Sequence, residues 1–280
     1  MNYPLIRVQE IAGGTVVVSV VMPSFNSTRH ISIAIESVRR QSFPHFELLV
    51  VDGGSRDETC EVVCEIIRQE PRVRLIKNEN DHGPAHARSI GIKQARGHYI
   101  AFLDADDYWL PEKLESQVSF MSRTSTQFCF SRYRSVSGDG QRLGCLVPMR
   151  ESYNYRQALK HRGIGTLTVM IERELLSEDV ISVWRRAGGE EYLWWLLILR
   201  KGVTACLVDK DLARYRDTTG SLSKNWMYTL CSVWNMYRTD LALPVAQAIW
   251  DFCSYFIDSA IRKIRLTVCG VVNGKVALEK

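Results

Sequence analysis

The first hundred residues alternate between short apolar runs and longer segments in which apolar residues recur at helical spacing. Val16–Met22 and Glu47–Val51 are rich in apolar residues with few polar interruptions, which is typical of strands buried on both faces of a sheet. Between them, Ile31, Ile35 and Val38 recur at the spacing of a helix with one apolar face. This rhythm predicts βαβ units and an α/β fold, with a mostly parallel central sheet and helices on both faces.

The same rhythm continues to about residue 114. Further strands are expected at Val73–Ile76 and Tyr99–Leu103, with a helix over 84–94 between them. Right-handed crossovers place the carboxyl ends of parallel strands at one rim of such a sheet. Polar loops follow three of these strands, and we expect them to meet at that rim: 23–26, 52–55 and 104–107.

Beyond residue 114 the pattern changes. Gly138-Asp139-Gly140 is a strong turn signal after an expected strand at Gln127–Val136, and another strand is expected at Gly163–Ile171. Residues 225–268 have mostly helical character and many aromatic residues. We therefore predict one domain over residues 1–224, which starts with an irregular leader over 1–14, and a helical C-terminal extension over 225–280.

Three carboxylates directly follow the apolar run at Tyr99–Leu103, namely Asp104, Asp106 and Asp107. Burying a carboxylate without a partner is unfavourable, so this cluster requires a cation, basic partners or open water. Asp104 and Asp106 lie two residues apart where a strand becomes a loop, and there they can share one divalent ion with phosphate oxygens. The competing interpretation is an acidic turn that caps the helix starting near Pro111.

Composition restricts the class of protein. With 46% hydrophobic and 24% charged residues, the chain is typical of a globular protein with a sizeable core. The net charge of +5 is mild and scattered, and no nucleic-acid motif is present, so no nucleic-acid partner is expected. No run of about 18 apolar residues occurs, so no membrane span is expected. We expect a cytoplasmic protein.

Cysteine usage supports the same compartment. The chain has eight cysteines, none in a Cys-x-x-Cys pair. Cys60 and Cys64 lie one helical turn apart with no histidine nearby in the sequence, and structural zinc would need a second pair of ligands. We therefore expect buried free thiols in a reducing compartment.

Several segments together resemble the bacterial family 2 glycosyltransferases. They are Pro23-Ser-Phe-Asn26, Val50-Val-Asp52-Gly-Gly-Ser55-Arg-Asp57, Gly83-Pro-Ala-His-Ala-Arg88, Phe102-Leu-Asp104-Ala-Asp106-Asp107, Gly189-Glu190-Glu191-Tyr192 and Leu212-Ala-Arg-Tyr-Arg216. Their order and spacing match over roughly residues 16–224, and the set is specific as a group although each motif alone is weak. The resemblance implies the GT-A fold, a nucleotide-sugar donor, a divalent metal, inversion at the anomeric carbon and a role in surface polysaccharide synthesis.

The resemblance also implies roles for individual residues. Asp106 is the implied ligand of Mn²⁺ or Mg²⁺, and Asp104 the implied partner of the ribose or of a metal-bound water. For Arg88, a position facing the nucleotide and a solvated helix arginine are equal alternatives. The implied nucleotide-sugar-binding residues are Pro23, Phe25, Asp52, Arg88, Asp104, Ala105 and Asp106.

The implied catalytic base is Glu191, which matches the second acidic residue of a Glu-Asp pair before an aromatic helix in the family. Glutamate at this position departs from the family pattern, and both Glu190 and Glu191 can instead simply favour a helix N-terminus. Gly53 stands where many relatives have a second aspartate, which leaves the recognition of uracil open.

Four further residues are candidates for the site: Asn26, Glu190, Trp195 and Arg216. Trp195 either stacks on an acceptor sugar or belongs to the core, and we favour the core for at least one residue of the pair Trp194 and Trp195. Arg216 either approaches the diphosphate or lies on the surface.

The predicted function is inverting transfer of a sugar from a nucleotide diphosphate donor, with a UDP-sugar favoured, to a hydroxyl of a glycan or lipid-linked acceptor. The alternative is a non-catalytic nucleotide-sugar-binding or scaffold subunit of a polysaccharide-assembly complex. A nucleotidyltransferase would need a glycine-rich basic loop near the first strand, which Pro23–Thr28 lacks. The helical segment Trp226–Ile264 packs on the domain, pairs with another copy or makes peripheral contact with the inner face of the cell membrane.

Overall fold

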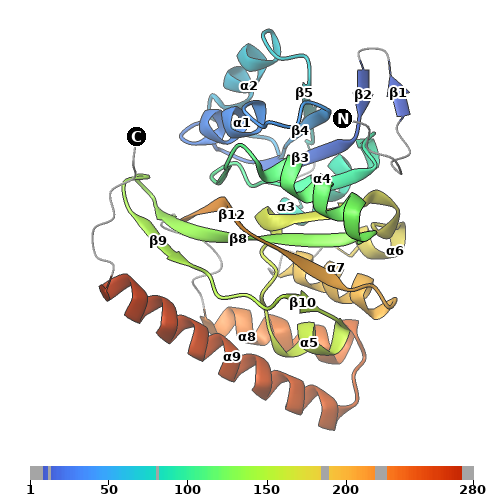
Figure 1. Cartoon of the computed structure of the whole chain (residues 1–280), viewed down its shortest axis with the longest axis vertical. Helices are drawn as coiled ribbons and strands as arrows, with labels where there is room; N and C mark the ends of the chain where they lie inside the picture. Colours follow the sequence, from blue (N-terminus) through green and yellow to red (C-terminus); the bar gives the residue numbers. More distant parts are fainter. Residues whose placement is uncertain (1–8, 12–13, 80–81, 184–188, 218–225, 273–280) are drawn as a thin grey trace.

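The computed structural model describes residues 9–11, 14–79, 82–183, 189–217 and 226–272. Within these residues, one long mixed sheet is covered by helices on both faces, and a separate two-stranded hairpin lies near the N-terminus (Figure 1). No described helix combines the length and the apolar character needed to cross a membrane.

The strands up to residue 109 are β1 (Gln9–Ile11), β2 (Gly14–Val16), β3 (Val18–Ser24), β4 (Phe46–Asp52), β5 (Val73–Lys77), β6 (Tyr99–Phe102) and β7 (Tyr108–Trp109). The later strands are β8 (Phe128–Ser137), β9 (Leu143–Leu146), β10 (Ser152–Tyr153), β11 (Val169–Glu172) and β12 (Ala205–Asp217). The helices of the first half are α1 (Ile31–Arg39), α2 (Thr59–Ile67), α3 (Pro84–Gln94) and α4 (Lys113–Thr124).

The helices of the second half are α5 (Tyr155–Lys160), α6 (Glu178–Ile181), α7 (Glu190–Arg200), α8 (Trp226–Asn235) and α9 (Val245–Val272). Two short 3₁₀ turns, η1 (Thr166–Thr168) and η2 (Arg173–Leu175), flank β11, and a π-helical turn, η4 (Met236–Asp240), follows α8.

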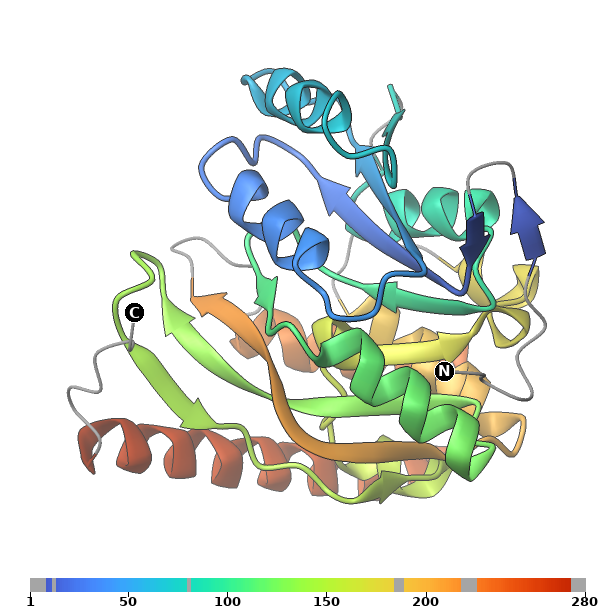
Figure 2. The ribbon, with the colours of Figure 1, turned by 45° about the horizontal axis from the view of Figure 1, so that its top comes forward.

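Four neighbouring strands form the parallel part of the sheet, in the order β6-β3-β4-β5. β3 pairs in parallel with both β4 and β6, and β4 pairs in parallel with β5. The predicted parallel sheet is thus confirmed, and the carboxyl ends of β3, β4 and β6 lie at one rim. β11 then joins antiparallel to β6 and β8, and the long strand β12 runs parallel to β8 (Figure 2).

The core lies on both faces of the sheet, because the central strands β3, β4 and β6 are buried at every position and mostly apolar. Val20 packs with α1 and α4 on one face, and the next residue, Val21, packs with α3 and α7 on the other. α3 lies unusually close to the sheet, since a Cβ on Gly91 would fall 2.4 Å from Val21. A larger side chain at residue 91 would therefore push away the helix that carries Arg88.

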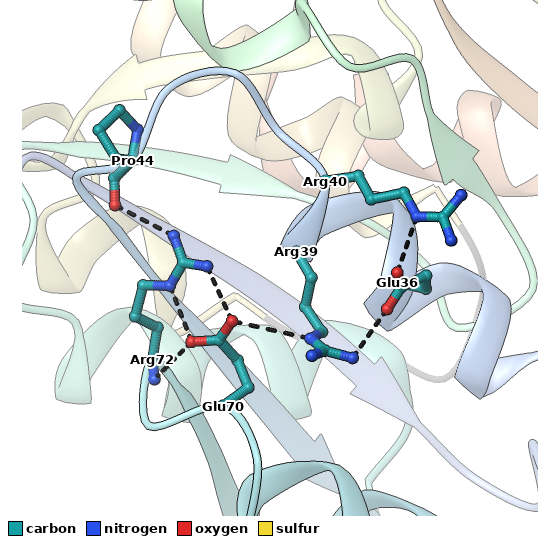
Figure 3. A network of polar contacts seen from close by, with 6 residues as sticks. All are labelled: Glu36, Arg39, Arg40, Pro44, Glu70 and Arg72. Atoms are coloured by element: carbon teal, nitrogen blue, oxygen red, sulfur yellow. Dashed lines mark hydrogen bonds and ion pairs between the residues drawn. The ribbon is translucent and has the colours of Figure 1, made fainter.

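An ion-pair network stabilises the opposite rim (Figure 3). Glu70 accepts hydrogen bonds from Arg72 at 2.8 Å and lies 3.7 Å from Arg39. The hydrogen bonds from Arg72, the largest effect, together with the nearby charge of Arg39, lower the pKa of Glu70 despite its burial. Arg39 and Arg40 in turn donate to Glu36. The network joins the end of α1 to the turn before β5, away from the polar loops at the other rim.

Several local expectations are corrected. The leader is not irregular throughout, because β1 and β2 form a hairpin within it. The strand expected at Gly163–Ile171 is shortened by η1. The expected domain boundary at 224/225 lies outside the described residues.

Six described cysteines are free thiols: Cys60, Cys64, Cys129, Cys206, Cys231 and Cys253. Only Cys129 among them is buried, so the expectation of buried thiols is wrong for the other five. Cys145 on β9 is disulfide-bonded, so the expectation of free thiols is wrong at that position. Sequence spacing alone does not reveal which cysteines a fold brings together.

Candidate active site

A cavity of about 890 Å³ lies at the rim where β3, β4 and β6 end. Its walls come from the loops after these strands, from the first turns of α3 and α7, and from α8. All the polar loops that were expected to converge therefore contribute to it. The predicted site residues that line it are Pro23, Phe25, Asn26, Arg88, Asp104, Ala105, Asp106, Glu190 and Glu191.

The loop after β3 is fixed to the loop after β4. The backbone N–H of Asn26 donates to Ser55 Oγ at 2.9 Å, and Asn26 Oδ1 accepts from the backbone N–H of Arg56 at 2.9 Å. Asn26 has a φ of 48°, in the left-handed region that asparagine tolerates better than most residues. These contacts hold Phe25 at the cavity wall, where its ring is 52% exposed.

Asp52 organises this pair of loops and does not line the cavity. Its carboxylate accepts from the backbone N–H groups of Gly54 and Ser55 at 3.0 and 2.9 Å, and from the hydroxyl of Ser24 at 3.1 Å. Burial raises its pKa, but the hydrogen bonds from Ser55 and Ser24 outweigh this effect and lower the pKa. The expectation that Asp52 lines a nucleobase pocket is corrected for this reason, and the neighbouring Gly53 lines the cavity instead.

The acidic loop after β6 divides its carboxylates between the cavity and the interior. Asp104 and Asp106 line the cavity, whereas Asp107 is 2% exposed. Burial, followed by the charges of Asp104 and Asp106, raises the pKa of Asp107 well above its usual range. Asp107 therefore acts as a structural acceptor, while Asp104 and Asp106 face the cavity.

Arg216, near the end of β12, binds this acidic loop from the interior of the protein. Its backbone N–H donates to Asp107 Oδ1 at 2.8 Å, and its Nε donates to the backbone carbonyl of Asp106 at 2.8 Å. Arg216 is buried and does not line the cavity. Both expectations for it, a diphosphate contact and a surface position, are therefore corrected, since its guanidinium is committed to the backbone of the loop.

Arg88 connects two carboxylates that are distant in sequence. Its guanidinium donates to Asp104 through Nη2 and to Glu191 through Nη1. The side chain of Arg88 is only 4% exposed, so the alternative of a solvated helix arginine is wrong. Gly83, at a φ of 96°, and Pro84 begin α3 at the cavity edge and place Arg88 about one turn inside the helix. One buried cation thus joins the acidic loop to the first turn of α7.

The first turn of α7 carries Glu190 and Glu191, as predicted, and both line the cavity. The pair Trp194 and Trp195 follows within the helix, and both indoles are buried, at 0% and 1% exposure. Trp195 packs against the rings of Phe102 and Phe128 at 5.8 and 5.3 Å between centroids. Of the two alternatives for Trp195, stacking on an acceptor sugar is wrong, and the core position that we favoured for at least one residue of the pair is confirmed.

Sequence reasoning missed the wall opposite the acidic loop. Arg162, Tyr192 of α7 and Met236 of η4 line the cavity there, as do residues of α8. The guanidinium of Arg162 lies 5.9 Å from the ring of Tyr192 and hydrogen-bonds Tyr255 of α9. The only local signal for Arg162 is a basic residue between a short helix and a glycine, which is too common to single it out.

His30 is a second missed lining residue. Burial, then the nearby charges of Arg216 and Arg29, lower the pKa of His30. The imidazole is therefore neutral at pH 7. Its position between a polar loop and α1 gave no sequence signal, because single histidines are frequent near helix starts.

The residues at the acidic loop fit a divalent cation that shares its coordination shell with a ligand. No group of three or more His, Cys, Asp or Glu side chains in the described part of the chain is arranged to hold a metal by itself. Mg²⁺ and similar ions are commonly held by one or two carboxylates plus substrate phosphates. Asp106 can supply such a carboxylate, with Asp104 two residues away on the same loop.

Comparison with known proteins identifies relatives across most of the chain. The family model described as "Glycosyl transferase family 2" matches residues 19–178. TuaG of Bacillus subtilis, named as a teichuronic acid biosynthesis glycosyltransferase, is 36% identical over 246 residues, which cover 88% of this chain and 96% of TuaG. WfgD of Escherichia coli, named as a UDP-Glc:α-D-GlcNAc-diphosphoundecaprenol β-1,3-glucosyltransferase, is 34% identical, covering 86% of this chain and 92% of WfgD.

Solved structures share the fold. Residues 1–349 of Staphylococcus aureus TarS, crystallised with UDP-GlcNAc, give a TM-score of 0.66 at 20% identity, covering 86% of this chain and 71% of that one. The mannosyltransferase PcManGT of Pyrobaculum calidifontis, in complex with GDP-Man and Mn²⁺, gives a TM-score of 0.63 at 15% identity. The match covers 92% of this chain and 80% of PcManGT. These likenesses confirm the predicted GT-A architecture.

Proposed function

The chain belongs to glycosyl transferase family 2, and from this premise we propose that it moves a sugar from a nucleotide diphosphate donor to an acceptor hydroxyl with inversion at the anomeric carbon. The observation that carries this proposal is the link through Arg88, which holds Asp104 and Glu191 at one cavity. The carboxylate proposed for the donor side, Asp104, and the candidate base, Glu191, are thus ion-paired with the same guanidinium.

The donor is proposed to bind along the loops after β3 and β6. Phe25 and Pro23 offer apolar surface for a nucleobase, and Asp104, Ala105 and Asp106 border the region for the ribose and diphosphate. Relatives and structural neighbours are named for UDP-Glc, UDP-GlcNAc and GDP-Man, so a nucleotide sugar is the supported class and a UDP-sugar the favoured member. Asp52 supports this region indirectly, through the two loops that it ties together.

Asp106 is proposed to hold Mn²⁺ or Mg²⁺ together with the donor phosphates. When bound, the metal would supply positive charge that offsets the negative charge of the departing nucleoside diphosphate. Arg88 contributes a second positive charge at the same side of the cavity. The hydrogen bonds that Arg216 donates to the buried Asp107 and to the backbone carbonyl of Asp106 keep the acidic loop in place while the donor binds.

Glu191 is proposed as the base that takes the proton from the attacking hydroxyl. A single displacement needs one carboxylate positioned on the acceptor side, and such a base typically contributes about 10²–10⁴ in rate. Glu191 fits this role because it lies in the first turn of α7, which forms part of the cavity wall, and because its carboxylate is held there by the ion pair with Arg88. Glu190 lies beside it and is the alternative carboxylate.

The acceptor is proposed to be a glycan or a lipid-linked saccharide used in surface polysaccharide synthesis. The name of TuaG refers to teichuronic acid biosynthesis, and the name of WfgD to a diphosphoundecaprenol-linked acceptor. With an acceptor of this kind, the enzyme is proposed to act in the cytoplasm at the inner face of the cell membrane. We also propose that residues 1–224 form the transferase domain and 225–280 an extension, of which α8 contributes to the cavity wall.

A screen of nucleotide sugars by thermal shift, with and without Mn²⁺, tests donor and metal together. Ligand binding to the native state raises the melting temperature, and the stabilisation grows with the logarithm of the ligand concentration divided by its Kd. We expect a nucleotide sugar to stabilise the protein, and more strongly with Mn²⁺. Transfer to a lipid-linked saccharide then separates an enzyme from a scaffold subunit, because a scaffold would bind the donor without turnover. Absence of any metal-enhanced shift across UDP-, GDP- and dTDP-sugars contradicts the proposal.

A further inference from the structure

α9 presents an apolar face to the outside of the molecule. In both views it runs along the edge of the molecule opposite α1 and α2 (Figures 1 and 2). Its inward side packs on α5 and α8 through buried residues such as Ala248 and Tyr255. Seven of the eleven large hydrophobic residues that are exposed in the described part of the chain lie on this helix: Val245, Ile249, Trp250, Phe256, Ile257, Ile261 and Ile264. Scattered exposure is normal, but a concentrated patch marks an interaction surface.

The spacing of these residues makes a continuous stripe. Trp250, Cys253, Ile257, Ile261 and Ile264 follow one another at intervals of three or four residues, so they share one side of the helix. Trp250, Ile257 and Ile264 are 67%, 56% and 62% exposed. Of the described charged residues of α9, Asp251, Asp258 and Arg262 lie toward the inward side, whereas Lys263 and Arg265 are exposed on either side of Ile264 in the sequence. The residues of the stripe itself carry no charge.

A second, smaller cavity borders the stripe. It has a volume of about 180 Å³ and includes Ile261 of the stripe among its lining residues. Its polar walls are supplied by the segment before β10, the residue after α5 and the inward edge of α9: Arg150, His161, Asp258, Arg262 and Arg265. The apolar stripe and this polar cavity therefore meet at one residue.

Positive charge is in excess in the small cavity. Asp258, the only carboxylate among the described residues that line it, accepts a hydrogen bond from Arg262 Nη2 at 2.8 Å and lies 2.8 Å from His161 Nδ1. Arg150 Nη1 lies 3.2 Å from His161 Nε2. Neither Arg150 nor Arg265 forms an ion pair with another described residue. Three guanidinium groups thus face one carboxylate, an arrangement that suits a phosphate group.

We propose that α9 lies on the surface of an anionic bilayer, with its apolar stripe in the interface and a lipid phosphate in the small basic cavity. A phospholipid presents a phosphate next to apolar chains, and this pairing matches a basic cavity that adjoins an apolar stripe. Amphipathic helices with an aromatic residue on the apolar face and basic residues at its border bind membranes in this way.

A second copy of the chain fits this surface less well. Pairing two such stripes would bury apolar area, but the described acidic residues of α9 face inward, and Asp258 is engaged with Arg262. The arginines of the small cavity would then gain no anionic partner. An anionic bilayer supplies both the apolar environment and the negative charge.

The proposal deepens the proposed function but does not depend on it for its test. His161 lines the small cavity and the next residue, Arg162, lines the large one. A bilayer docked on α9 would therefore lie beside the wall of the large cavity that contains Arg162. This wall lacks the predicted donor residues. A lipid-linked acceptor would reach that wall without leaving the membrane surface.

Flotation of the full-length protein with vesicles tests the docking surface. We expect the protein to float with vesicles of equal parts phosphatidylcholine and phosphatidylglycerol, and much less with phosphatidylcholine alone. Ile257→Glu should lower the partition by more than about tenfold, because it replaces a buried apolar contact with a charge. Ile33→Glu is the matched control, since Ile33 is 48% exposed on α1, and it should float as the wild type does.

The basic cavity needs its own variant. Arg265→Gln should lower the partition on phosphatidylglycerol vesicles about fivefold, the effect of one basic residue near an anionic surface. Arg123→Gln, an exposed arginine on α4, should change it little. Equal flotation of all four variants overturns the proposal. So does a wild-type dimer in sedimentation that Ile257→Glu dissociates without any vesicle binding, because the stripe is then a contact between copies. Donor-induced thermal shifts of the same variants report on the proposed function separately.

Discussion

Replacing Glu191 by glutamine tests the proposed base with a minimal change in shape. The substitution keeps the length of the side chain and one oxygen that can accept from Arg88 Nη1. It removes the negative charge and the ability to take a proton. Because Arg88 also pairs with Asp104, the guanidinium does not lose its last carboxylate partner.

The expected effects differ in size for catalysis and stability. Loss of a general base should lower kcat by about 10²–10⁴. A hydrogen bond between charged groups contributes about 1.5–3 kcal/mol, and the glutamine oxygen keeps part of it, so the free energy of unfolding should fall by less than about 2 kcal/mol. The Kd for the donor should change little, because the proposed donor contacts lie on the loops after β3 and β6.

The assay is transfer from a nucleotide sugar under saturating Mn²⁺, with donor affinity measured by calorimetry on the same samples. Glu190→Gln is the matched control, since Glu190 lies in the same helical turn and also lines the cavity. We expect it to retain most of its kcat. If Glu191→Gln keeps kcat within about tenfold of the wild type while Glu190→Gln loses it, the base is Glu190 and the argument from the Arg88 contact is refuted.

Three further predictions concern the metal, the nucleobase and a buried lysine. Asp106→Asn should abolish the Mn²⁺-dependent part of donor binding, measured by calorimetry with and without the metal; an unchanged metal dependence would contradict the proposed ligand. Phe25→Ala should weaken donor binding by about tenfold or more if the exposed ring stacks on the base, whereas Ile33→Ala should not, and the comparison of the two Kd values checks this. Burial lowers the pKa of Lys113 from 10.5 to about 7, so between these values the unfolded chain binds more protons than the native one. The free energy of unfolding of the wild type, relative to that of Lys113→Met, should therefore rise between about pH 7 and pH 9 by up to about 1.4 kcal/mol per pH unit. Urea unfolding of both proteins measures this difference. A difference that stays constant with pH would argue against a neutral lysine in the fold.

The parallel part of the sheet was predictable because its determinants are local. Apolar runs identified β3, β4 and β6, and the handedness of βαβ crossovers then placed their carboxyl ends at one rim. The helix over 84–94 was predicted with the observed bounds because Pro84 at its start and Gly97 just beyond its end mark both limits. The convergence of three polar loops on one cavity followed from topology alone.

The direction of individual side chains was not predictable in the same way. Asp52 stands at a strand end like Asp104, and only the surrounding donors decide its role. Ser24 and Ser55 satisfy its carboxylate, so it does not line the cavity. Trp195 follows the same logic, because helix periodicity cannot show that α7 is covered on nearly every side once other elements pack around it.

Arg88 shows what three-dimensional structure adds to these alternatives. The sequence offered a nucleotide-facing arginine or a solvated one, and both treat its charge as facing outward. The structure buries the guanidinium between a carboxylate of the acidic loop, 16 residues away in the sequence, and one of the first turn of α7, 103 residues away. Removing water from such a contact is favourable only when the charges are compensated, so Asp104 and Glu191 hold each other in place through Arg88. A donor phosphate that approaches Asp104 also approaches the cation that orients Glu191. In the proposed mechanism, the position of the base is therefore coupled to the occupation of the donor site, which would favour transfer to the acceptor over transfer to water.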